Sequence, residues 1–279
     1  MKLVSLGSPA LALELTLNSG QAFHWLREGH GWVGAIGETA VYLEQRAGEL
    51  FVNLGAELAA TNYLALDHPL GEIEASFPKD PVSQEALAFC RGMRILRQPK
   101  WEALATFITS SMKQVSHIAQ ISHTLRQRFG SAHVLNHKPV YSYPTPEALA
   151  ALQEADLRKC ALGYRAANLL ATARKVASKE VDLDSIAVLP DPEAQMALRA
   201  LPGVGEKVAN CALLFGFERL KAFPVDVWIE RVIRERYFTK RQKATPAAIR
   251  TFCATNFGPY GGYAQQYLFH HARLTWKKG

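Results

Sequence analysis

The chain has 279 residues, of which 48% are hydrophobic and 20% are charged, values typical of a globular protein with two or three subdomains. Its 32 lysines and arginines exceed its 25 acidic residues, and the resulting net charge of +7 favours a polyanionic partner. The four cysteines are far apart and form no CxxC pair, which argues against a zinc site or a cysteine-ligated iron–sulfur cluster.

An antiparallel β-sheet is predicted for the N-terminal part of the chain. Alternating leucines over 11–17 have the period of a strand and argue against a signal peptide. No apolar run approaches the length of a membrane span. We therefore expect a protein of the cytoplasm, most simply a prokaryotic one. The expected strands are 11–17, 22–27, 31–36, 39–45 and 49–54.

Helical patterns begin near Gly55 and dominate the rest of the chain. Prolines 69, 78 and 81 mark a loose boundary near residue 80. The sequence thus predicts an α+β protein with an antiparallel β domain over 1–80 and an α-helical core over 81–279. The expected helices are 83–92, 101–129 with an interruption near 113–116, 145–152, 164–180, 191–201, 206–217, 226–238, 245–256 and 261–275.

A helix-hairpin-helix unit is predicted at about 193–217, with the turn LPGVG at 201–205. Gly203 and Gly205 allow the backbone to bend around Val204, whose side chain can point inward. The N–H groups at the start of the second helix would then face a phosphate oxygen of DNA. A tight turn between two helices without any ligand is the alternative.

Two residues near this hairpin could carry chemistry. Lys207 lies in the first turn of the second helix, where the helix dipole and partial desolvation favour a neutral amine, a nucleophile for a sugar C1′. Taken alone, it is more simply a surface lysine. Cys211 follows four residues later on the same helical face. Asp226 starts another helix and could serve as its N-cap, as a fixed carboxylate that stabilises a cationic sugar, or as both.

These segments resemble a known superfamily. LPGVGEKVANC at 201–211 and FPVDV at 223–227 are similar to the helix-hairpin-helix DNA glycosylases, and the lysine indicates members with lyase activity. Three further segments resemble the 8-oxoguanine DNA glycosylases in particular. They are LNSGQAFHW at 17–25, LGYRA at 162–166 and GPYGGYAQ at 258–265, and the likeness extends from about 11 to 276.

The resemblance implies a bifunctional DNA glycosylase/AP lyase that excises 8-oxoguanine from duplex DNA, acting as a monomer. Lys207 would form the Schiff base and Asp226 would be its acidic partner. The carbonyl of Gly20 would accept the N7–H that only the oxidised guanine carries. Cys211 and Phe269 would sandwich the flipped base, and Gln265 would bind its Watson–Crick edge. The resemblance implies no catalytic metal and no organic cofactor. It does imply a monovalent cation bound by the hairpin carbonyls.

The resemblance also assigns DNA contacts outside the base pocket. Tyr164 would wedge into the duplex and Arg165 would contact the orphaned cytosine, while Gly203, Val204 and Gly205 would hold the DNA backbone. The chain departs from eukaryotic members at Met112, Lys113 and His117, which replace asparagines and an arginine. Met112 would fill the vacated space and Lys113 would contact phosphate. A strict preference for cytosine opposite the lesion is therefore not expected. Trp228 replaces a histidine that contacts phosphate in the family.

Other interpretations remain open at this point. A related helix-hairpin-helix glycosylase for alkylated or other oxidised purines would share the lysine and the aspartate. A non-catalytic helix-hairpin-helix DNA-binding protein would explain the hairpin and the charge but not Lys207 and Asp226 together. Taken singly, Phe269 could be a core aromatic residue, Tyr164 a packed helix-start residue and Gly20 an ordinary turn glycine.

Overall fold

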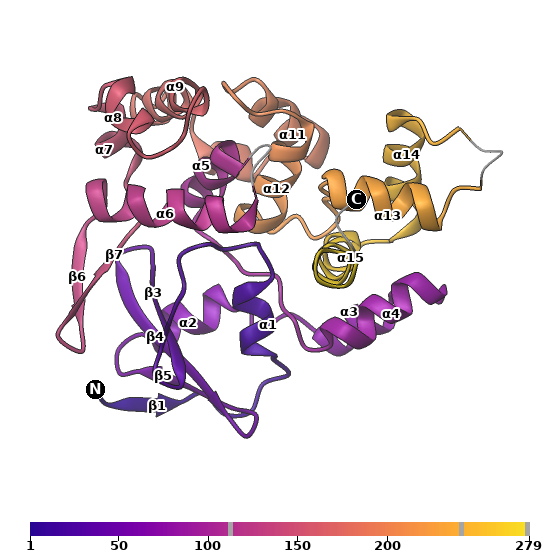
Figure 1. Cartoon of the computed structure of the whole chain (residues 1–279), viewed down its shortest axis with the longest axis horizontal. Helices are drawn as coiled ribbons and strands as arrows, with labels where there is room; N and C mark the ends of the chain where they lie inside the picture. Colours follow the sequence, from indigo (N-terminus) through magenta and orange to yellow (C-terminus); the bar gives the residue numbers. More distant parts are fainter. Residues whose placement is uncertain (111–113, 240–242, 277–279) are drawn as a thin grey trace.

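The computed structural model describes residues 1–110, 114–239 and 243–276. Five antiparallel strands form a sheet of order β1-β5-β4-β3-β2 (Figure 1). Leu43 in the central strand pairs with Trp32 on one side and Val52 on the other, and all three are buried. The strands are β1 Leu3–Ser5, β2 Leu26–Glu28, β3 Gly31–Ile36, β4 Thr39–Arg46 and β5 Glu49–Asn53. The predicted α+β fold is confirmed, because this sheet is followed by an almost wholly helical chain.

Two strand predictions were wrong. Residues 11–17 do not form a strand; helix α1 covers Leu13–Asn18. In a helix, this segment places Leu13, Thr16 and Leu17 on one face, and these three side chains are buried. Leucine and glutamate are strong helix formers, so the segment had no firm strand preference. Of 22–27, only the end is a strand, because the residues before it lie between two hydrophobic cores: Phe23 packs into one and Trp25 into the other.

Helices make up most of the rest, and each predicted helical segment overlaps at least one of them. They are α2 Glu57–Tyr63, α3 Leu70–Ala75, α4 Pro81–Cys90, α5 Lys100–Ser110, α6 Val115–Phe129, α7 Pro146–Ala150, α8 Glu154–Arg158, α9 Arg165–Ala177, α10 Leu183–Ala187, α11 Asp191–Arg199, α12 Glu206–Gly216, α13 Val227–Arg236, α14 Pro246–Asn256 and α15 Gly261–Thr275. Capping explains several starts: the side chains of Thr145 and Thr245 each accept a backbone N–H before a proline in the first turn. None of the described helices is both long and apolar enough to cross a membrane.

A β-hairpin that the sequence did not predict links the helical core to the sheet. Strands β6 Ala132–Leu135 and β7 Lys138–Tyr141 project from the end of α6 and lie beside β3 and β4 (Figure 1). The turn uses Asn136 and His137, both in the left-handed region. Two side-chain contacts attach the hairpin to the sheet: His133 lies 3.3 Å from a carboxylate oxygen of Glu38, and Lys138 forms an ion pair with Glu28 at 3.1 Å.

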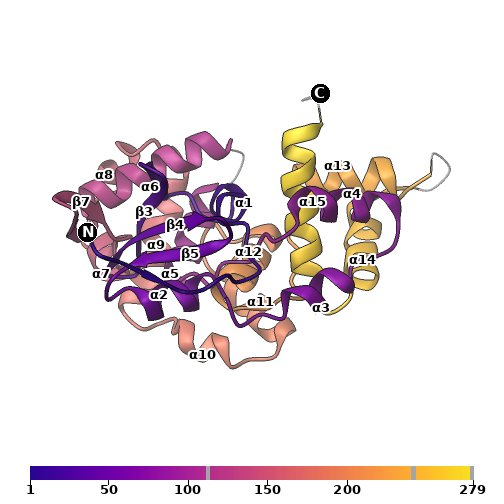
Figure 2. The ribbon, with the colours of Figure 1, turned by 90° about the horizontal axis from the view of Figure 1, so that it is seen from below.

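The segment after the sheet packs against the C-terminal helices. Helices α3 and α4 lie beside α15, on the same side of the molecule as α13 and α14 (Figures 1 and 2). Leu70, Ile73 and Phe77 accordingly belong to the larger of the two hydrophobic cores. The predicted boundary near residue 80 falls between α3 and α4. The last helix thereby comes close to both the N-terminal turns and the helix-hairpin-helix unit.

Candidate active site

A cleft of about 980 Å³ opens where the turn after α1, the hairpin before α12 and helix α15 meet. The six residues with a predicted catalytic or base-binding role line it together: Gly20, Lys207, Cys211, Asp226, Gln265 and Phe269. They come from four segments that are far apart along the chain. Their convergence makes this cleft the candidate active site.

Lys207 points across the cleft towards α5. Its Nζ donates to Oγ of Ser110 at 3.3 Å and lies 5.0 Å from the ring centroid of Phe107. Ser110 donates its own proton to the carbonyl of Phe107 at 2.8 Å, so an oxygen lone pair faces the amine. The lysine is therefore held over the floor of the cleft rather than extended into solvent.

Cys211 and Asp226 flank the lysine. Cys211 is buried one turn further along α12, and burial raises the pKa of its thiol to about 11, so the thiol stays neutral. Asp226 is the N-cap of α13, with Oδ1 accepting the N–H of Ile229 at 2.9 Å. Burial also raises the pKa of Asp226, against the opposing effects of that N–H and of Lys207. Asp226 thus caps a helix and faces the lysine at the same time.

Gly20 is held firmly between two anchored peptides. The carbonyl of Ser19 accepts from Gln266 Nε2 at 2.9 Å, and the carbonyl of Gln21 accepts from Gln98 Nε2 at 2.7 Å. Gly20 itself has φ +86°, a conformation that other residues rarely adopt. A Cβ added at Gly20 would stand 3.2 Å from Cε1 of Phe269. The glycine and the aromatic ring therefore form one wall of the cleft.

Gln265 lies one helical turn before Phe269 on α15. Its side chain is almost fully buried, and within the described part of the chain its Oε1 has no hydrogen-bond partner. A buried acceptor left without a donor costs about 1–3 kcal/mol. Because this residue lines the cleft, a ligand that carries N–H groups would satisfy it.

The hairpin forms the rim of the cleft. Gly203 has φ +77° and approaches α9 so closely that a Cβ there would be 2.7 Å from Cβ of Asn168. Thr172 donates to the carbonyl of Pro202 at 3.0 Å, which ties the turn to the same helix. Val204 is buried, as its inward-pointing side chain was predicted to be, while Gly203 and Gly205 are exposed. The backbone of the hairpin is therefore open to solvent at the start of α12.

Comparison with known proteins identifies the chain. Residues 4–104 match the model of the 8-oxoguanine DNA glycosylase N-terminal domain, and residues 105–257 match that of the HhH-GPD superfamily of base excision DNA repair proteins. The N-glycosylase/DNA lyase OGG1 of Arabidopsis thaliana is 30% identical over 93% of this chain and 76% of its own length. The chain belongs to the 8-oxoguanine DNA glycosylase family.

Two further members of the family support this assignment. A probable N-glycosylase/DNA lyase of Methanothermobacter thermautotrophicus is 31% identical over 72% of this chain and 70% of its own length. The 8-oxoguanine glycosylase/lyase of Clostridium acetobutylicum, solved in complex with double-stranded DNA containing cytosine opposite 8-oxoguanine, superposes with a TM-score of 0.90. That match covers 98% of both chains at 28% identity. The N-terminal sheet and the helical core are thus both those of an 8-oxoguanine DNA glycosylase.

The residues expected to contact DNA outside the base pocket differ in their exposure to solvent. Tyr164, at the start of α9, is 58% exposed, which is compatible with the predicted role of its side chain as a wedge in the duplex. Arg165 is only 6% exposed, with its guanidinium carbon 4.3 Å from the ring centroid of Tyr164. A contact with an orphaned cytosine would require Arg165 to turn outward. His117 is exposed on α6, whereas Met112 and Lys113 lie outside the described residues.

Several residues of the cleft in this glycosylase were missed by sequence reasoning. Phe107 and Ser110 contact Lys207 but come from a helix without a recognisable motif. Arg273 lies against Phe269, with its guanidinium carbon 5.6 Å from the ring centroid. A signal for Arg273 did exist, because Gln265, Phe269 and Arg273 follow one another at intervals of four residues on one helical face.

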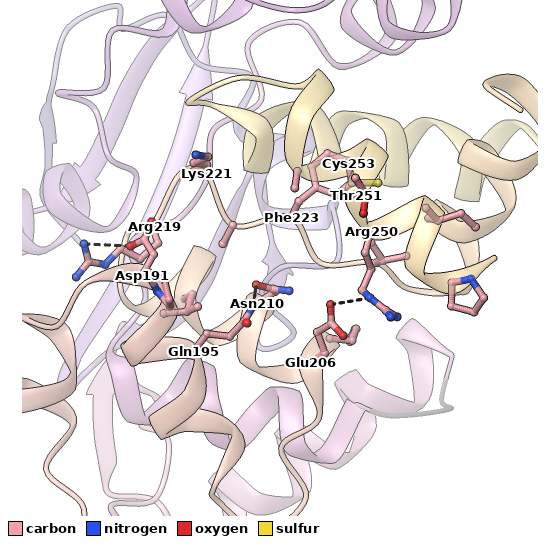
Figure 3. A pocket seen from close by; sticks show the side chains of 18 of the residues that line it. Asp191, Gln195, Glu206, Asn210, Arg219, Lys221, Phe223, Arg250, Thr251 and Cys253 are labelled. Carbon is pink, nitrogen blue, oxygen red and sulfur yellow. Dashed lines mark hydrogen bonds and ion pairs between the residues drawn. The ribbon is translucent and has the colours of Figure 1, made fainter. Parts of the chain in front are cut away.

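Lys207 and Glu206 also border a second cleft, of about 960 Å³, on the side of α12 that faces α14 (Figure 3). Six of its polar residues form three pairs: Arg250 with Glu206 at 3.4 Å, Arg219 with Asp191 at 3.4 Å, and Gln195 with Asn210 at 2.9 Å. Gly20, Gln265 and Phe269 line only the first cleft. The first cleft is therefore the one suited to a flipped base.

Proposed function

We propose that this protein is a DNA glycosylase and AP lyase that removes 8-oxoguanine from duplex DNA. The observation that carries the proposal is the meeting of Lys207 and Asp226 in one cleft with Gly20, Gln265 and Phe269. A base inside the duplex is inaccessible at C1′, so the nucleotide must leave the stack and enter the cleft. The exposed backbone of the hairpin and the net charge of +7 support binding of the DNA phosphates that holds it there.

The cleft suits an oxidised guanine. The flipped base would lie between Cys211 and Phe269, with its N7–H donating to the Gly20 carbonyl. Guanine presents a lone pair at N7 instead, which that carbonyl repels. The unpaired Oε1 of Gln265 would accept N–H groups of the Watson–Crick edge. Both recognition groups sit on backbone or helix positions that other contacts hold in place, and such rigidity favours selectivity.

Base removal and strand cleavage then share one nucleophile. The neutral amine of Lys207 bonds to C1′ while the N9–C1′ bond breaks and its electron pair leaves with the base, which gains a proton. The C1′–O4′ bond opens to give an imine to Lys207. Loss of a C2′ proton then expels the 3′ phosphate and nicks the strand. Asp226 would stabilise positive charge on the sugar during the first step.

Cofactors, assembly and location are further proposals. We propose that the chain acts as a monomer without a metal or an organic cofactor, because the chemistry uses only an amine and a carboxylate. A monovalent cation at the hairpin carbonyls is proposed on family resemblance alone. A prokaryotic cytoplasm is the proposed compartment, since the chromosomal substrate lies there. Activity that is unchanged after dialysis against a chelator would support a mechanism without a metal, and loss of activity would contradict it.

A lesion panel tests the proposed function. Duplexes with 8-oxoguanine opposite each of the four normal bases should be cleaved, with the preference for cytosine weaker than in enzymes that have an arginine at position 117. Borohydride should trap the wild-type protein on these duplexes and should not trap Lys207→Gln, which has a slightly shorter, uncharged side chain and lacks the amine. Excision of 3-methyladenine in preference to 8-oxoguanine would instead indicate an alkylated-base glycosylase.

A further inference from the structure

The turn that carries Gly20 is bound to helix α15 by two side chains. Arg273 Nη2 donates to the carbonyl of Asn18 at 2.9 Å, and Gln266 Nε2 donates to the carbonyl of Ser19 at 2.9 Å. The two donors are seven residues apart, so they lie on the same face of α15 at a distance of two turns. We call Gln266 and Arg273 the α15 clamp. It holds the two peptides immediately before Gly20.

Arg273 also lies beside Gly20 and against the ring of Phe269. Its Nη1 would be 3.5 Å from a Cβ at Gly20, and its guanidinium lies against the Phe269 ring. Nη2 is also 3.0 Å from Nδ1 of His270, and burial lowers the pKa of that imidazole to about 4, so the ring is a neutral acceptor. The arginine therefore contacts both the turn and the aromatic ring that together form one wall of the cleft.

Stability alone does not explain an arginine at this position. Arg273 is partly buried, and its Nε has no hydrogen-bond partner within the described part of the chain. Burying a guanidinium with an unsatisfied N–H is costly, and apolar side chains of similar volume are often as stable or more so. Its two hydrogen bonds go instead to the carbonyl of Asn18, in the turn that carries Gly20, and to the imidazole of His270.

We propose that the α15 clamp positions the Gly20 carbonyl and thereby determines the selectivity of this protein for 8-oxoguanine over guanine. This inference rests on the proposed function. The carbonyl attracts N7–H and repels an N7 lone pair only at hydrogen-bond distance, and a shift of about 1 Å weakens both effects. Gln266 and Arg273 are positioning residues: they act through the Gly20 peptide, whereas Lys207 acts on the sugar.

Arg273→Met tests the clamp, because methionine retains an apolar stem over Phe269 but has no donor. In a Lys207→Gln background, affinities are measured for three otherwise identical duplexes containing 8-oxoguanine, guanine or a tetrahydrofuran abasic analogue. We expect the preference for 8-oxoguanine over guanine to fall about tenfold, as for loss of a charged hydrogen bond. Binding to the abasic analogue, and cleavage of a preformed abasic site by Arg273→Met with Lys207 intact, should stay within about twofold of the parent.

Two further variants complete the test. Arg273→Lys should restore part of the selectivity, and Gln266→Leu should lower it without removing a charge. Arg236→Met is the matched control, since Arg236 is a half-exposed arginine on α13 that contacts Trp276 and Glu85 outside the cleft. If Arg273→Met loses its fold, Gln266→Leu carries the test.

Three outcomes would overturn the inference. Selectivity could stay unchanged in both clamp variants. All three duplexes could weaken equally with a shallower salt dependence, which would make Arg273 a phosphate contact. Abasic-site cleavage could fall in parallel with selectivity, which would indicate a general structural role. A wild-type protein that does not prefer 8-oxoguanine would refute the proposed function itself, which is a different result.

Discussion

The main chain of Gly20 lies against the ring of Phe269, close enough that a methyl group on Gly20 would stand 3.2 Å from Cε1. The two residues belong to the first turn after α1 and to the last helix. Their contact forms the wall of the cleft that must separate an oxidised guanine from a normal one. The narrow space at this wall makes the glycine the most sensitive position for recognition.

Gly20→Ala should reduce excision of 8-oxoguanine at least about tenfold, because the methyl group presses on Phe269 and the φ of +86° becomes strained. Cleavage of a preformed abasic site should change much less, since no base has to be bound. Gly29→Ala is the matched control: Gly29 also has positive φ, but its Cβ would meet nothing within 4 Å. Equal effects of the two substitutions on excision would show that strain, not contact, is responsible.

The decline of the excision rate at low pH should reflect protonation of Asp226. Burial raises the pKa of this carboxyl above its usual value, so it loses its charge at a higher pH than an ordinary aspartate as pH falls. The single-turnover rate should therefore decline as pH drops through that raised pKa. Asp226→Asn should be slower by about a hundredfold or more and lack this decline. Asp80→Asn, at the N-cap of α4, serves as a control for capping alone. Retention of the decline in Asp226→Asn would assign it to another group.

Gly203→Ala should weaken binding to every duplex, with or without a lesion. A Cβ there would be 2.7 Å from Cβ of Asn168, so the hairpin must move away from α9 and its N–H groups from the phosphate. We expect a loss of about tenfold in affinity at fixed salt. Gly55→Ala, at another positive-φ glycine with open space around it, should bind normally. A lesion-specific loss in Gly203→Ala would contradict a purely backbone contact.

Glu102→Gln should destabilise the fold. Glu102 and Arg126 form a buried ion pair beside His24 of the N-terminal domain, whose Nδ1 is 3.5 Å from Oε1 of Glu102. Removing the carboxylate leaves a buried guanidinium uncompensated, which costs about 3–5 kcal/mol of unfolding free energy. Urea denaturation measures this. Glu14→Gln, which breaks an exposed pair with Arg27, should cost less than about 1 kcal/mol. Similar costs for both would mean that burial does not strengthen the first pair.

Much of the fold was predictable because its signals are local. Gly203, Gly205 and the capping residues act through their own backbone, and the helices that they start or join lie close to where the sequence predicted them. The strand predicted over 11–17 was wrong because its only basis was the alternation of leucines, a local signal that does not decide between strand and helix. A leucine pattern of this length fits either period, and only the core that receives Leu13 and Leu17 selects the helix.

For the candidate site, the sequence by itself determined which residue types carry the chemistry: a lysine after a glycine hairpin, an aspartate at a helix start, and a glutamine and a phenylalanine one turn apart. Tertiary structure alone decided what surrounds them. Ser110 meets Lys207, and Arg273 meets Asn18, only after distant segments have packed. Local motifs depend on backbone geometry within a few residues, whereas these contacts depend on packing between elements that no spacing in the chain encodes.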